Sequence, residues 1–372
     1  MKTVKTPGLY IHIPFCRTKC PYCGFYSIAS TKAVSRWLAA LGREARLYRD
    51  QFPAFDTLYL GGGTPSILKT RDLERILHAV SSHFHVPGEG ERTLEANPGD
   101  LTAEKIVRLK ALGFNRISLG VQSFHDHELR FLGRRHRGAD GIKALENLRG
   151  LGFKNLSVDL MYGFQGQTLK SWVQTLRQAL AFEPEHLSCY QLTFEKGTLF
   201  WRQRERHRIT PIPESLERAF FLITSRFLKR NGYVHYEISS FARGKAFRSR
   251  HNSKYWRHAP YLGLGPSAHS YQHDRRWWNV SSVRKYCDAL EQGRLPIEGS
   301  ERLSEDQIRL ESLALGLRTN HGVALSECTG PHLDIKIARL KEAGLIRIAG
   351  HRMKPTLRGM LVADRLPVFL SA

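Results

Sequence analysis

Long apolar runs, acidic residues and cysteines are all scarce in this sequence of 372 residues. No stretch approaches the ~18 apolar residues that a membrane-spanning helix needs, so we expect no membrane span. The first eight residues, Met-Lys-Thr-Val-Lys-Thr-Pro-Gly, lack the apolar core of an export signal, which predicts a cytoplasmic protein. Hydrophobic residues nevertheless make up 41% of the chain, enough to form a buried core.

The shortage of acidic residues leaves a strongly basic chain. Asp and Glu number 34 against 57 Lys and Arg, which gives a formal net charge of +23. Such a surface attracts polyanions, so nucleic acid, the carboxylates of a tetrapyrrole and an acidic redox partner are all chemically suitable. A generally basic, solvated surface explains the same number, and charge alone does not decide among these alternatives. The excess is concentrated at 134–137, 202–208, 243–250 and 275–276.

Half of the six cysteines lie in one short segment. Cys16, Cys20 and Cys23 follow an apolar stretch with the spacing Cys-x-x-x-Cys-x-x-Cys. Three thiolates this close can bind three irons of a [4Fe–4S] cube and leave the fourth iron open for a small molecule. A structural zinc site usually needs four ligands, and a disulfide is unexpected without an export signal, so both alternatives are less favoured. The remaining cysteines are scattered, and we expect reduced thiols at Cys189, Cys287 and Cys328.

Strand-like and helical segments alternate over residues 1–236. Six apolar strands, each followed by a helical pattern, favour a parallel sheet covered by helices. Because six units are too few for a closed eight-stranded barrel, we predict an α/β fold of the partial (β/α)₆ TIM-barrel type, open on one side. The first helix is expected over Lys32–Tyr48, and Thr102 is a suitable N-cap for a helix from Ala103. The expected strands are Leu9–Ile13, Thr57–Leu60, Thr93–Ala96, Arg116–Val121, Leu156–Met161 and His186–Leu192.

The alternation ends after residue 236. Residues 237–300 are rich in Gly, His, Arg and aromatic residues, and we interpret them as a functional extension. Residues 301–372 contain a helical segment opened by Ser304 as N-cap, a second helix near Ile335–Ala343, and a strand pair around Gly350. This order predicts a winged-helix-like domain. Such domains often bind DNA, but many serve only in packing, so nucleic-acid binding is not favoured.

Glycine and polar residues stand at the ends of the expected strands, where a parallel barrel places its reactive groups. The run Gly61-Gly62-Gly63-Thr64 follows the second strand, and its missing side chains let the backbone approach a ligand. Glu95, Gln122 and Asp159 end the next three strands, and Arg134 follows in a loop. Buried carboxylates need donors. A ligand with ammonium and hydroxyl groups would supply them, and so would an internal Glu–Arg–Asp network that only braces the barrel.

With these motifs the chain resembles the radical S-adenosylmethionine (SAM) proteins and, within them, the oxygen-independent coproporphyrinogen III oxidase family. The resemblance covers residues 10 to about 365 and rests on Tyr10-Ile-His-Ile-Pro-Phe-Cys16, the glycine run, Glu95-Ala-Asn-Pro, Gly120-Val-Gln-Ser-Phe and Asp159-Leu-Met-Tyr-Gly. It implies a [4Fe–4S] cluster on the three clustered cysteines, SAM on the open iron, and a cellular electron donor. The family's SAM contacts fall on Tyr10, Tyr22, Gly62, Gly63, Thr64, Glu95, Gln122, Arg134 and Asp159.

Two branches of this family differ just after the third cysteine. The true oxidases carry a further cysteine where this chain has Phe25, and they have a long N-terminal extension that this sequence lacks. Both differences match the HemW-type haem-chaperone branch, which also has the motif His-Asn-x-x-Tyr-Trp, here residues 251–256. The resemblance therefore implies a protein that binds haem and passes it to acceptor haemoproteins. The alternative is an oxidase that decarboxylates coproporphyrinogen III to protoporphyrinogen IX, and radical modification of RNA ranks third.

The residue types around this motif also indicate a haem contact. Haem needs an axial nitrogen or sulfur ligand, an apolar aromatic slot and cations for two propionates. The residues that supply these groups are His251, Tyr255, Trp256, Arg248, Arg250 and Arg257. We predict that haem, or a related tetrapyrrole, contacts His251, with His269 as a second candidate ligand. The alternative is that the aromatic residues close the open side of the barrel while the arginines remain solvated.

Overall fold

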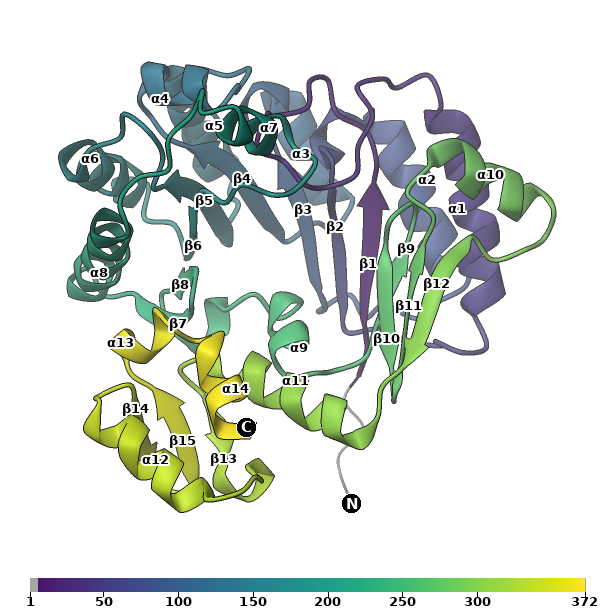
Figure 1. Cartoon of the computed structure of the whole chain (residues 1–372). Helices are drawn as coiled ribbons and strands as arrows, with labels where there is room; N and C mark the ends of the chain where they lie inside the picture. The colour runs from purple at the N-terminus through teal and green to yellow at the C-terminus, as the bar shows by residue number, and fades with distance from the viewer. Residues whose placement is uncertain (1–5, 372) are drawn as a thin grey trace.

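The computed structural model describes residues 6–371, and one twelve-stranded sheet forms most of it (Figure 1). The strand order is β12-β11-β10-β9-β1-β2-β3-β4-β5-β6-β8-β7. Neighbouring strands from β1 to β6 pair in parallel, which confirms the predicted partial barrel of six βα units. These strands are β1 (Gly8–Ile13), β2 (Thr57–Gly62), β3 (Glu91–Ala96), β4 (Arg116–Gln122), β5 (Leu156–Tyr162) and β6 (His186–Gln191).

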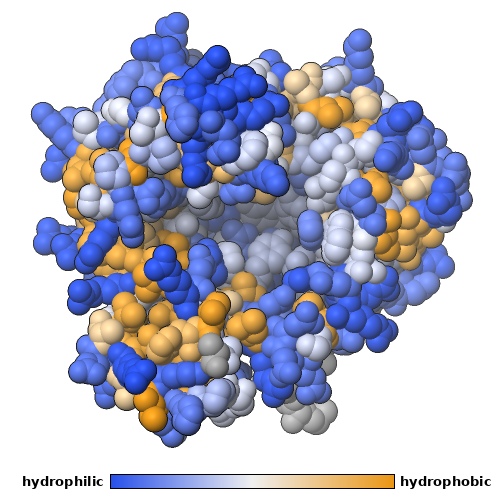
Figure 2. Space-filling model, in the orientation of Figure 1, coloured by the Kyte–Doolittle hydropathy of each residue, from blue (hydrophilic) through white to orange (hydrophobic). Residues whose placement is uncertain are grey.

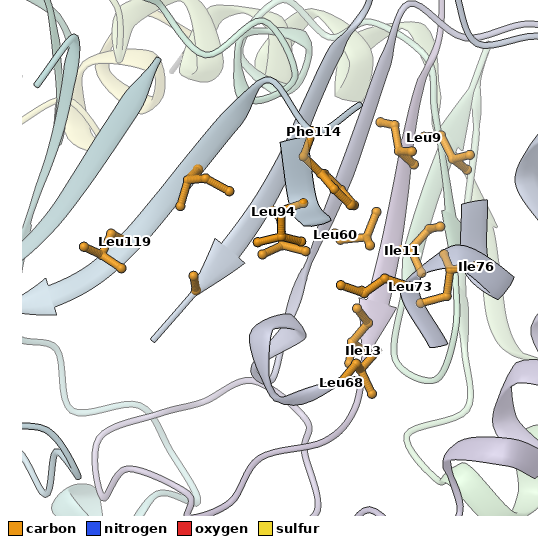
Figure 3. Packing of buried hydrophobic residues seen from close by; sticks show 14 of the residues in the cluster. Leu9, Ile11, Ile13, Leu60, Leu68, Leu73, Ile76, Leu94, Phe114 and Leu119 are labelled. Carbon is orange, nitrogen blue, oxygen red and sulfur yellow. The ribbon is translucent and has the colours of Figure 1, made fainter. Parts of the chain in front are cut away.

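Helices cover the outer face of these strands because the side chains alternate. Ile11 and Ile13 are completely buried on that face, where Figure 3 shows them beside Leu73 of the second helix. Tyr10 and His12, which alternate with Ile11 and Ile13 in the sequence, point to the opposite face and into the barrel. The helices and short 3₁₀ turns of this part of the chain are α1 (Val34–Tyr48), η1 (Pro65–Ile67), α2 (Thr70–Ser81), η2 (Pro98–Asp100), α3 (Ala103–Ala111), α4 (Asp126–Phe131), α5 (Gly138–Gly150), α6 (Leu169–Leu180), α7 (Leu199–Glu205) and α8 (Glu214–Arg230).

Residues 237–300 extend the sheet at both of its edges. β8 pairs antiparallel with β6, whereas β9 returns to the other edge and pairs in parallel with β1. β10, β11 and β12 then continue that edge as antiparallel strands. The elements are β7 (Val234–Glu237), β8 (Ser240–Ala242), η3 (Lys245–Phe247), α9 (Asn252–Trp256), β9 (Tyr261–Leu264), β10 (His269–Gln272), β11 (Arg275–Asn279), α10 (Val283–Glu291) and β12 (Ile297–Arg302).

The C-terminal residues form a small unit with its own core and a three-stranded sheet, β13-β15-β14. Its helix–helix–hairpin outline confirms the winged-helix-like arrangement, and Ser304 Oγ accepts the Gln307 N–H at 3.2 Å as the expected N-cap. Thr102 caps α3 in the same way, through the N–H of Lys105. The elements are α11 (Glu305–Leu317), β13 (Val323–Ala324), η4 (Leu325–Glu327), α12 (Leu333–Glu342), β14 (Ile346–Ala349), β15 (Arg352–Pro355), α13 (Leu357–Met360) and α14 (Arg365–Ser371).

Two further observations bear on the expectations from composition. Among residues 6–371, no helix is both long enough and apolar enough to cross a membrane. All six cysteines are free thiols. Residues 1–5, which belong to the polar N-terminal segment that argued against export, lie outside the described residues.

Candidate functional site

The loop after β1 gathers the three predicted iron ligands. Cys16 is buried, Cys20 and Cys23 are half-buried, and all three line one pocket at the carboxyl end of the sheet. Thr64 Oγ1 donates a hydrogen bond to Cys16 Sγ at 3.3 Å, and Arg134 Nη1 donates one to Cys20 Sγ at 3.5 Å. These two contacts fix the positions of the Cys16 and Cys20 sulfur atoms at the pocket.

The three thiols line this pocket but do not form a site for a single metal ion. Within residues 6–371, no three His, Cys, Asp or Glu side chains form a group that could hold a single metal ion. In a [4Fe–4S] cube each thiolate binds a different iron, so the ligands lie around the cube. The lining of this pocket includes no fourth cysteine. The donor set therefore fits a cube with one open iron better than a zinc ion.

Helix α7 holds the cysteine loop from one side. Phe200 N donates a hydrogen bond to Pro21 O at 2.9 Å, and the Phe200 ring lies 6.3 Å from the ring of Tyr22. Burial raises the pKa of the Tyr22 hydroxyl, and the nearby Arg134 charge opposes that rise. Phe25 follows on the same loop and is 65% exposed. The position that is a cysteine in the oxidase branch therefore carries an exposed aromatic side chain.

Two buried polar atoms beside this pocket have no partner. Gln122 Oε1 and Arg134 Nε are inaccessible to solvent and make no hydrogen bond within the described part of the chain. Gln122 also has a φ of 65°, which non-glycine residues rarely adopt unless the surrounding structure imposes it. Arg134 Nη2 donates to Gly120 O at 2.7 Å and is thereby held at the end of β4. An orphaned acceptor next to an orphaned donor fits a polar ligand such as SAM.

The glycine run joins the ends of β1 and β2. Gly63 N donates to Ile13 O at 2.8 Å, and Thr64 N donates to Phe15 O at 2.8 Å. A Cβ atom at Gly63 would lie 2.6 Å from Phe15 O and 2.7 Å from Ile13 O, so a side chain does not fit. Gly62 has a φ of 101°, in the region that favours glycine. These glycines therefore fix the position of the cysteine loop, because the protein itself fills the space that their side chains would take.

Glu95 lies inside the barrel next to this run. Its carboxylate accepts hydrogen bonds from Tyr59 OH at 2.8 Å and from Gly62 N at 3.2 Å. Burial, and to a lesser degree the charge of Asp159, raise the pKa of Glu95 to about 7 against the effect of these bonds. Asp159 accepts a bond from Ser118 Oγ at 2.9 Å, and Tyr10 is close enough to Glu95 for the Glu95 charge to help raise the Tyr10 pKa.

The alternative to a ligand is an internal Glu95–Arg134–Asp159 network that only braces the barrel, and its arginine is wrong. Arg134 bonds to Gly120 and Cys20 and is bonded to neither carboxylate. The arginine that acts on both is Arg116 of β4, which is 2% exposed and whose charge opposes the rise in the pKa of Glu95 and of Asp159. Sequence reasoning missed Arg116. The signal was the strand alternation, which places Arg116 on the same inner face as Ser118.

His251 has contacts that differ from those expected of a haem ligand. It is 1% exposed, its Nδ1 lies 2.9 Å from Thr57 Oγ1, and its Nε2 lies 2.9 Å from Tyr255 OH. Burial lowers the pKa of His251 to about 3, so the ring is neutral. Both ring nitrogens are thus bonded within the protein, and an iron ligand at this position would require one of these bonds to break.

The other residues of the expected haem slot point to different neighbours. The Arg248 guanidinium lies 5.2 Å from the ring centre of Tyr236. The guanidinium of Arg318, in the C-terminal unit, lies 4.9 Å from the ring centre of Trp256. Arg250 pairs with Asp56 at 3.8 Å. The motif therefore links the base of the barrel to the C-terminal unit, and the haem contact of His251 stays a prediction.

Comparisons with known proteins agree with this geometry. Residues 10–179 match the model of the Radical SAM superfamily, and residues 303–362 match that of the HemN C-terminal domain. Heme chaperone HemW of Bacillus subtilis is 34% identical over 96% of this chain and 97% of its own length. The HemW heme chaperone of Synechocystis is 39% identical over 86% of this chain and 79% of its own length. The chain belongs to the HemW family.

The solved structure of coproporphyrinogen III oxidase (HemN) from Escherichia coli has a TM-score of 0.84 to this HemW-family chain. It covers 99% of this chain and 91% of that one at 24% sequence identity, and this likeness shows the fold. The predicted family and branch are confirmed. The radical SAM domain implies a [4Fe–4S] cluster and SAM, and the cysteine pocket with its orphaned polar atoms suits both groups.

Proposed function

We propose that this HemW-family chain is a cytoplasmic haem chaperone, which takes up haem or a related tetrapyrrole and passes it to acceptor haemoproteins. The names of its curated relatives support the proposal. The observation that carries it is Phe25, a 65% exposed side chain beside the cysteine pocket at the position where the oxidase branch has a cysteine. Oxidase chemistry is therefore not the activity we expect.

The cofactor sites follow from the pocket. Cys16, Cys20 and Cys23 would hold the cluster, which when bound supplies one electron to SAM. The orphaned Arg134 Nε and Gln122 Oε1 would bind polar groups of SAM. The backbone of the glycine run would approach SAM closely because it carries no side chains. The full set that we assign to SAM is Tyr10, Tyr22, Gly62, Gly63, Thr64, Glu95, Gln122, Arg134 and Asp159.

A cellular electron donor is the further partner of this proposal. Helix α7 lies against the cysteine loop, and Arg202, Arg204, Arg206 and Arg208 at this helix and just beyond it are exposed. Figure 2 shows a hydrophilic surface at this end of the molecule. A basic surface next to the cluster suits an acidic one-electron carrier, and the rate of cluster reduction by such a carrier should fall as salt rises.

An anaerobic comparison tests the function directly. One sample of reconstituted protein is titrated with haemin and followed by its Soret absorption. A second is incubated with coproporphyrinogen III, SAM and a chemical reductant, and the porphyrinogens are separated and quantified. We expect saturable haem binding and no conversion. Protoporphyrinogen formed over many turnovers would overturn the chaperone proposal in favour of oxidase activity. The triple variant with Ala at Cys16, Cys20 and Cys23 controls for conversion that needs no cluster.

A further inference from the structure

The curved sheet encloses a hollow, which Figure 2 shows at the centre of the molecule. Strand register determines which residues of the β10–β11 hairpin face it. Trp277 and Ser270 are opposite each other, and Trp277 Nε1 donates to Tyr48 OH of α1 at 2.8 Å, on the helix-covered side. The next pair, His269 and Trp278, must therefore lie on the inner face.

His269 differs from the other histidines of the barrel interior. His12 is bonded to Tyr10 OH and Tyr26 O, and His186 to Ser157 and Tyr236, so each uses both ring nitrogens. His251 does the same, as described above. His269 is exposed, and its ring makes no hydrogen bond within residues 6–371. Of these four imidazoles, it is the one that is exposed and without a hydrogen-bonded partner in the described part of the chain.

Trp278 holds the His269 ring in place. The two rings are stacked, with centroids 5.9 Å apart and an interplanar angle of 26°. Trp278 in turn lies over Gly299 of β12, where an added Cβ would collide with the indole ring. An imidazole fixed in this way loses little conformational entropy when it binds a ligand.

The surroundings of His269 keep its ring neutral. Although part of the side chain is open to solvent, partial burial lowers the pKa of His269, and the positive charge of Arg276 on the same inner face lowers it further. Arg276 is itself held by Glu301 and by Glu311, the latter at 2.6 Å. A neutral imidazole keeps the nitrogen lone pair that coordinates iron.

We infer that His269 is the axial ligand of haem iron in this chain, with the Trp278 indole fixing the orientation of its imidazole. The inference rests on the proposed haem-chaperone function and assigns the ligand within it. One ring nitrogen donates its lone pair to the iron, and the proton remains on the other nitrogen. His251, with both nitrogens bonded in the protein, then supports the fold at the base of the barrel.

Haemin titration of four full-length proteins tests this assignment: the parent, His269→Ala, His251→Ala and the control His273→Ala. His273 is exposed at the tip of the same hairpin, so its removal tests for effects on the hairpin alone. We expect His269→Ala to shift the Soret band and to weaken haem binding by roughly tenfold or more, which corresponds to about 1.4 kcal/mol. His273→Ala should keep the parent's Soret position, a Soret change in His251→Ala alone would return the ligand to His251, and the iron–sulfur absorption of all four should match.

Imidazole added to His269→Ala should restore the parent's Soret position, because it supplies the missing ligand and not a missing structural contact. A His269→Gln variant, which keeps a polar side chain of similar size, should bind haem as weakly as the Ala variant. Unchanged haem binding by both His269 variants, with a parent that binds haem, would overturn the axial assignment and leave the chaperone function intact. A parent that binds no haem would overturn the proposed function itself.

Discussion

Glu44 of α1 should make the stability of this protein fall between pH 5 and pH 8. Its side chain is completely buried. It accepts hydrogen bonds from Gly265 N at 2.9 Å, Asn279 Nδ2 at 2.6 Å and Tyr286 OH at 2.5 Å. These donors come from the turn after β9, from the end of β11 and from α10. One carboxyl group thus attaches three parts of residues 237–300 to the first helix.

The direction of the effect follows from burial. Burial raises the pKa of Glu44 from 4.5 to about 7, so the folded state favours the neutral acid. Below pH 4.5 both states are protonated and there is no penalty; as pH rises from 4.5 to 7 the unfolded chain ionises first and stability is lost. With 1.36 kcal/mol per pKa unit, this loss is about 0.8 kcal/mol at pH 5 and about 3.3 kcal/mol at pH 8. The difference is about 2.5 kcal/mol.

Glu44→Gln isolates this contribution, because the amide does not ionise. Gln offers one acceptor oxygen where three donors converge, so the lost bonds should cost about 1–2 kcal/mol relative to the parent with protonated Glu44, and this cost does not depend on pH. Relative to the parent it should therefore gain about 2.5 kcal/mol between pH 5 and pH 8. We would measure thermal unfolding midpoints by tryptophan fluorescence under argon at both values, with Glu74→Gln on the exposed face of α2 as control. An equal gap between Glu44→Gln and the parent at both pH values would refute the reasoning.

Three further predictions concern the pocket. Replacing Cys16, Cys20 and Cys23 together by Ala should remove the iron, about four atoms per cube, and the broad absorption near ~400 nm; iron retained at the parent's level would disprove the cluster site. Gly63→Ala should lower both iron content and SAM affinity, because its Cβ would lie 2.6 Å from Phe15 O, whereas Gly88→Ala, with nothing within 4 Å, should match the parent. Arg134→Gln should weaken SAM binding by roughly 10- to 100-fold, the value of one or more charge-assisted hydrogen bonds, in an isothermal titration where the exposed Arg130→Gln serves as control; an unchanged affinity would remove Arg134 from the SAM site.

Signals carried by a few neighbouring residues gave correct predictions. The N-caps at Thr102 and Ser304 depend on a side chain and an amide three residues apart, so the chain itself brings them together. The six parallel strands follow from the repeated strand–helix rhythm. The cysteine spacing likewise lies within one loop, and the structure places all three thiols in one pocket. Residue types and spacing were enough for the family, the barrel and the location of its mouth.

Side-chain partners from distant parts of the chain were decided by the tertiary structure. The sequence singles out His251 because its neighbours are aromatic and basic, yet Thr57, nearly two hundred residues away, occupies one of its nitrogens. Glu44 gave no local signal and Arg116 only that of strand alternation, and each acts through groups on other elements. The physical reason is that burial and hydrogen-bond partners depend on which elements meet, and β9 returns to pair with β1 only in the folded sheet. The sequence thus specified the radical SAM framework, whereas packing decided which histidine faces the hollow.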